Sequence, residues 1–130
     1  MARGALTVAG IIEIVFRGIP AAIGVPAIAT MFGLDFDYGF IPYVHAFGAV
    51  MIVFGIMFLI AAKVPERNTL VINIAILRFF FGILAQLWTF IQLSQLQIDM
   101  HVFWWIHIII DAIMVLWLLA ARTRVMAKIA

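Results

Sequence analysis

The chain contains 130 residues, of which 68% are hydrophobic and 11% are charged, and its formal net charge is +2. Soluble domains carry about 25% charged residues, so the composition excludes a soluble domain and predicts one polytopic membrane domain over residues 1–130. The absence of cysteine excludes disulfides, thiolate metal sites and CxxC redox chemistry. The few basic residues lie at the edges of hydrophobic segments, so the expected partner is the lipid bilayer and not nucleic acid.

Four hydrophobic segments, at about 6–31, 42–62, 70–93 and 102–121, are each long enough to cross a bilayer as a helix. They predict an all-α fold, a bundle of four transmembrane helices. The first segment is interrupted by Glu13 and Arg17, so we expect a retained helix and not a signal peptide. It also contains Pro20 and Pro26, each of which removes a backbone donor and predicts a kink near the middle of this helix.

The next segments have simpler boundaries. Pro42 suits the first turn of the second helix, and a charged turn at residues 63–67 separates that helix from the third. The third helix contains Arg78 and becomes polar toward its C-terminal end, while the fourth is followed by a basic tail.

Charge at the ends of the helices predicts the orientation. Six basic residues fall on one side of the membrane, namely Arg3, Lys63, Arg67, Arg122, Arg124 and Lys128. The other side has Asp35, Asp37 and Asp99 and no lysine or arginine. The positive-inside rule therefore predicts a bacterial-type inner membrane protein with both termini in the cytoplasm.

Two acids and two bases lie inside the predicted spans: Glu13, Arg17, Arg78 and Asp111. At the rise of an α-helix, counted from the cytoplasmic ends, their depths are about 10, 16, 12 and 15 Å, respectively. Buried charges persist in an apolar medium only when they are paired. We therefore expect one neutral cluster, with Glu13 bound to Arg17 on the first helix. Asp111 then needs Arg78 or Arg17 as its partner, and the hypothesis to test is the Arg78–Asp111 pair between the third and fourth helices.

Further polar and aromatic residues lie on the outward side of this cluster. His107 precedes Asp111 by one helical turn, and Trp104 shares the same stripe. Thr89 and Gln92 continue the face of Arg78 on the third helix. These residues predict a pocket that opens outward and has the ionic cluster as its floor, for ligand binding or proton relay. The alternative is that the cluster only holds the helices in register.

The positions of the histidines allow three interpretations. His45 and His107 lie at similar heights on different helices, an arrangement that suits the two axial ligands of a haem, or a chlorin pigment. A copper site formed by His45, Met100, His101 and His107 is a second reading. Two hydrogen-bonded structural histidines are the third. The pair His107–Asp111 has no evident nucleophile beside it, so the sequence indicates a protein without catalytic residues.

Two resemblances bear on function. Residues 48–62 (GAVMIVFGIMFLIAA), the turn at 63–67 and the arginine within 74–82 (IAILRFFFG) resemble the DoxX-like group of small four-helix bacterial membrane proteins. That resemblance implies the fold, and some members of the group are associated with redox enzymes. In length, helix count and Glu13 the chain is also similar to the small multidrug resistance transporters, from which it departs by having Arg17 beside the glutamate.

Together these features predict a non-catalytic membrane protein. It is either an accessory subunit of a membrane complex, or a homo-oligomer, or a binder of a lipophilic ligand or pigment. One alternative is a proton-coupled transporter of small molecules with Glu13 and Asp111 as proton carriers. The other is a haem protein with two histidine ligands.

The orientation is testable because the natural chain has no cysteine. Asp37→Cys should react with a membrane-impermeant maleimide added to intact cells, whereas Lys128→Cys should react only after the membrane is opened. Labelling of Lys128→Cys from outside intact cells would reverse the predicted orientation.

Overall fold

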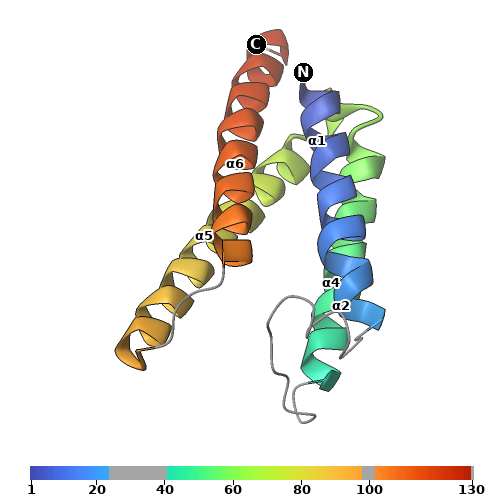
Figure 1. Ribbon diagram of the computed structural model, residues 1–130. Helices are drawn as coiled ribbons and strands as arrows, with labels where there is room; N and C mark the ends of the chain where they lie inside the picture. The colour runs from blue at the N-terminus through green and yellow to red at the C-terminus, as the bar shows by residue number, and fades with distance from the viewer. Residues whose placement is uncertain (24–40, 98–101, 130) are drawn as a thin grey trace.

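The computed structural model describes residues 1–23, 41–97 and 102–129, and all regular secondary structure in these residues is helical (Figure 1). Four helices are long and apolar enough to cross a membrane, which confirms the predicted all-α, four-span architecture. The elements in chain order are α1 (Ala2–Ile11), η1 (Ile12–Gly18), α2 (Ile19–Ile23), α4 (Ile41–Ala61), η3 (Pro65–Arg67), α5 (Thr69–Gln95) and α6 (Val102–Ile129).

The first span is irregular, but the predicted proline kink is not confirmed. The helix continues without a break from Ala2 to Ile23 through Pro20, and Pro26 lies outside the described residues. The irregular feature is η1, a π-helix, in which the N–H of Ile19 donates to the carbonyl of Ile14, five residues earlier. Pro20 follows directly after this change of hydrogen-bonding pattern.

The last helix is longer than predicted, because α6 continues to Ile129 beyond the expected end at residue 121. Its final turns have tertiary partners. Val125 is buried in the core, and the Nε of Arg122 donates a hydrogen bond of 2.6 Å to Oδ1 of Asn73 on α5. These contacts stabilise the helix past the hydrophobic segment.

The apolar core occupies the end of the bundle where both termini lie (Figure 1). It is built from the first turns of α1, the last turns of α4, the first turns of α5 and the second half of α6. Its members are Ala2, Ala5, Leu6, Ala9, Phe58, Ala61, Ala62, Ile72, Ala75, Phe79, Met114, Leu118, Ala121 and Val125. Alanines on α1 allow the neighbouring helices to approach closely, as is usual in membrane bundles.

The first span packs along α4 through glycines. A Cβ on Gly10 would lie 2.8 Å from the carbonyl oxygen of Gly55, and a Cβ on Gly55 would lie 2.8 Å from that of Gly10. Further along, a Cβ on Gly48 would lie 2.7 Å from the backbone of Ala21 and Ala22. The two backbones are therefore in direct contact at two levels.

The remaining helices form a second pair, in which α5 packs chiefly against α6, while α4 and α5 share few contacts. Figure 1 shows the C-terminal end of α5 apart from the N-terminal end of α4. Many large apolar side chains on the outer faces are exposed, among them Val53, Phe81 and Leu116, as expected for helices that face lipid.

The glycine contacts predict an asymmetric response to added methyl groups. Gly48→Ala should lower the free energy of unfolding by about 1–3 kcal/mol, because the new Cβ meets backbone that has no freedom to move aside. Gly4→Ala is the matched control: its Cβ would meet only Trp117 at 3.7 Å, so the better helix propensity of alanine should dominate. Detergent unfolding followed by circular dichroism measures both, and a Gly48→Ala variant as stable as the control would contradict the close approach.

Candidate functional site

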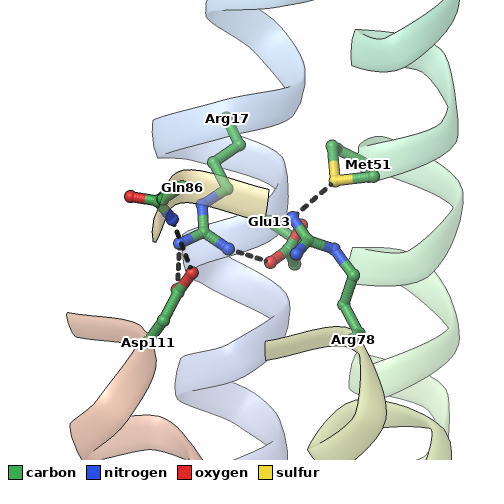
Figure 2. A network of polar contacts seen from close by, with 6 residues as sticks. All are labelled: Glu13, Arg17, Met51, Arg78, Gln86 and Asp111. Carbon is green, nitrogen blue, oxygen red and sulfur yellow. Dashed lines mark hydrogen bonds and ion pairs between the residues drawn. The ribbon is translucent and has the colours of Figure 1, made fainter. Parts of the chain in front are cut away.

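An ionic network lies where all four spans meet, at the edge of the apolar core that is farther from the chain termini (Figure 2). It starts on the π-helix η1, which carries Glu13 and Arg17, both buried. Nη1 of Arg17 donates to Oε1 of Glu13 at 2.6 Å. π-helical turns are rare and frequently occur at functional sites, and here the turn holds both charged side chains of the first span.

Arg17 also reaches across to α6, where its Nη2 donates to Oδ1 of Asp111. Asp111 is buried, and its second oxygen, Oδ2, accepts a hydrogen bond of 3.1 Å from Nε2 of Gln86 on α5. One guanidinium therefore joins two carboxylates that are 98 residues apart in sequence, and the Asp111 carboxylate is bound from two other helices.

Arg78 on α5 completes the charge balance. Its Nη2 lies 3.1 Å from Oε2 of Glu13 and 3.0 Å from the sulfur of Met51 on α4. The ring of Phe79 lies beside both guanidinium groups, 5.3 Å from Cζ of Arg17 and 5.9 Å from Cζ of Arg78. These separations are within the range of cation–π attraction, which strengthens where water is excluded.

Gly82 leaves the space in which the two halves of the network meet. It lies one turn after Arg78 and one turn before Gln86 on α5. A Cβ there would lie 2.7 Å from Oδ2 of Asp111 and 3.0 Å from Nη1 of Arg78. Any larger residue would have to displace one of these charged groups.

The network is neutral, and every oxygen of its two carboxylates has a hydrogen-bond donor. Each of the four carboxylate oxygens of Glu13 and Asp111 accepts one hydrogen bond from a guanidinium or amide group. Such pairing is what allows ionised side chains to exist away from water. The donors are less well matched, because Nε of Arg78 is buried without a partner among the described residues.

The structure brings together the four charges that the sequence placed in one layer. Of the two partners considered for Asp111, the favoured one, Arg78, was wrong. Asp111 is bound by Arg17, and Arg78 is bound by Glu13. Helical depth gives the height of a residue and not the direction in which it faces. The first span packs against both α4 and α6 through α1, and Arg17, on the following η1, reaches Asp111 on α6.

Two of the other predicted site residues, Thr89 and Gln92, lie at the surface of α5. The hydroxyl of Thr89 donates to the carbonyl of Ala85 at 3.0 Å. His107 is half-buried, with its ring 6.4 Å from that of Trp104. The predicted pocket formed by these residues remains a prediction.

The metal and haem readings concern His45, His101 and His107. His45 is exposed on α4, and His101 lies outside the described residues, as does Met100. Within residues 1–23, 41–97 and 102–129, no three His, Cys, Asp or Glu side chains gather to hold a metal ion.

Three residues of the network were not selected from the sequence: Gln86, Met51 and Phe79. A signal was present for Gln86, which follows Arg78 by two turns and Gly82 by one and therefore shares their face. Met51 and Phe79 look like ordinary core residues in the sequence, since nothing distinguishes them from their apolar neighbours.

Comparison with known proteins adds no relative: no family model, curated protein or solved structure matches the chain. The resemblance to the DoxX-like group therefore stays a prediction. Function has to be argued from the site itself.

A double-mutant cycle tests the assigned pairing. Asp111→Asn should lower the free energy of unfolding by about 3 kcal/mol, because it leaves Arg17 charged and without one of its partners. The coupling energy between Asp111→Asn and Arg17→Gln should be about 1.5 kcal/mol, at the upper end for membrane proteins. The control pair, Asp111→Asn with Arg78→Gln, also removes one negative and one positive charge, and it should show a smaller coupling energy. A larger coupling in the control pair would restore the pairing expected from depth alone.

Proposed function

We propose that this protein binds a lipophilic ligand within the membrane, with the polar group of the ligand placed against the ionic network at Arg78. The observation that carries the proposal is the uneven exposure of the network. The side chain of Arg78 is 14% exposed, whereas those of Glu13, Asp111 and Arg17 are 0%, 1% and 5% exposed. Arg78 is thus the charged side chain of the network that a molecule from outside the bundle can approach most easily.

The surroundings of Arg78 support the same proposal. Arg78 lies on α5 and contacts Met51 on α4, and these two helices share few contacts. Beyond the network, α5 exposes Thr89 and Gln92 among large apolar side chains such as Trp88 and Ile91. A molecule with an apolar chain and a polar end suits this mixture, since binding sites for small molecules are mainly apolar with a few polar groups.

The transporter alternative is less well supported by this geometry. Its proposed proton carriers, Glu13 and Asp111, both accept hydrogen bonds from Arg17, and Glu13 also binds Arg78. A carboxylate that exchanges protons needs access to solvent or substrate and has to release its hydrogen-bond partners, and neither carboxylate is exposed. No contact of the described residues favours an accessory subunit over a ligand binder, so partner proteins that copurify remain the test of that alternative.

The orientation belongs to the same proposal. Both chain ends and η3 lie at one end of the bundle (Figure 1), together with the basic residues of the termini and the turn. This arrangement supports a cytoplasmic location for both termini.

Lipid analysis of the purified protein tests the proposed function. Wild-type protein, purified in mild detergent from the membranes in which it is made, should retain a lipophilic compound above the level in empty-vector membranes. Arg78→Gln should lose that compound, because the exposed donor is gone. The charge-neutral variant Glu13→Gln/Arg78→Gln should lose it too, which guards against loss through an unpaired charge.

Arg122→Gln is the matched control, since Arg122 binds Asn73 at the end of the core and not the network, and it should retain the compound. An absorption spectrum of the same samples shows whether the compound is a pigment. Equal lipid content in wild type and both Arg78 variants would overturn the proposal.

A further inference from the structure

The ionic network has more hydrogen-bond donors than acceptors, and the excess is located on Arg78. A guanidinium carries five N–H donors. All four carboxylate oxygens are already engaged, yet Nε of Arg78 has no partner among the described residues. This unpartnered donor lowers the stability of the protein, because a buried polar group without a hydrogen bond costs free energy.

The side chain that contacts Arg78 from α4 is Met51, which is a weak hydrogen-bond acceptor. Its thioether sulfur lies 3.0 Å from Nη2 of Arg78 (Figure 2), and a thioether is a weak acceptor compared with a carbonyl oxygen. Methionine is flexible and tolerates repacking, so the side chain can leave this position without a change in the backbone of α4. The contact therefore marks a position that a stronger acceptor would fill.

The charge of the network limits what that acceptor can be. With two carboxylates and two guanidinium groups in ion pairs, the site is already neutral. An anionic head group would add an unbalanced charge at membrane depth, which is unfavourable.

From these three observations we infer that the ligand presents an uncharged carbonyl group to Arg78, as in a lipid ester, amide or ketone. This carbonyl replaces the sulfur of Met51 beside Nη2 and also accepts a hydrogen bond from the unpartnered Nε of the same guanidinium. The inference rests on the proposed function and narrows it to one chemical class. The ligand supplies an acceptor without adding charge, and its apolar chain lies in the membrane.

A matched series of probes separates the possible head groups. We would use brominated compounds of one chain length: the methyl ester, the free carboxylate and the hydrocarbon. Quenching of tryptophan fluorescence in lipid nanodiscs reports their binding, because Trp88 and Trp104 lie on the same two helices as Gln86 and Asp111. The ester should bind at least about tenfold more tightly than the carboxylate at a pH where the acid is ionised, a difference of about 1.4 kcal/mol.

Variants of Met51 test the position of the carbonyl. Met51→Gln supplies a carbonyl oxygen from the protein, so ester affinity should fall about tenfold. Met51→Leu removes the sulfur and should bind the ester at least as well as wild type. Ile56→Gln, which adds the same amide at an exposed position of α4, should have no effect.

Different results would overturn the carbonyl inference and the proposed function. Tighter binding of the carboxylate than of the ester would overturn the inference and leave the proposed function in place. Unchanged ester affinity in Met51→Gln would also overturn it. If none of the three probes binds and the purified protein retains no lipophilic compound, both the inference and the proposed function fail.

Discussion

The bundle depends on one side chain, the guanidinium of Arg17, which binds Glu13 on its own helix and Asp111 on α6. Neither carboxylate would be stable at this depth without a cation beside it. The bridge in turn fixes the rotation of the first span, since Arg17 has to face α6 while the glycines on the same span face α4. The charge pairing and the backbone contacts therefore specify the same helix orientation from opposite sides.

The network also divides the molecule into two unlike halves. On the side of the termini, small and branched side chains fill a continuous core. On the other side, α5 exposes most of its residues and shares little surface with α4. The ionic layer thus lies between the packed half and the half where the helices separate, and Arg78 is its most exposed charged member.

Much of the fold was predictable because membrane spans follow directly from length and hydrophobicity. The layer of four charges was also predictable, since helical rise converts sequence position into depth. The partner of Asp111 was not, because depth carries no information on which way a helix faces its neighbours. The π-helix was not predictable either, because residues 12–18 show no pattern that distinguishes a π turn from an α turn. The prolines instead led to the prediction of a kink, which the structure does not confirm.

The π-helix has a consequence for chain length. A π turn accommodates one residue more than an α turn of the same helix, so η1 can be regarded as an α-helix with a single extra residue between Ala9 and Ile19. Removing one residue between Glu13 and Arg17 would return the helix to regular geometry and leave both flanking segments against α4, but the spacing of these two residues would change from four to three. A one-residue deletion at this position is therefore compatible with the packing of the first span and alters the geometry of the Arg17 bridge.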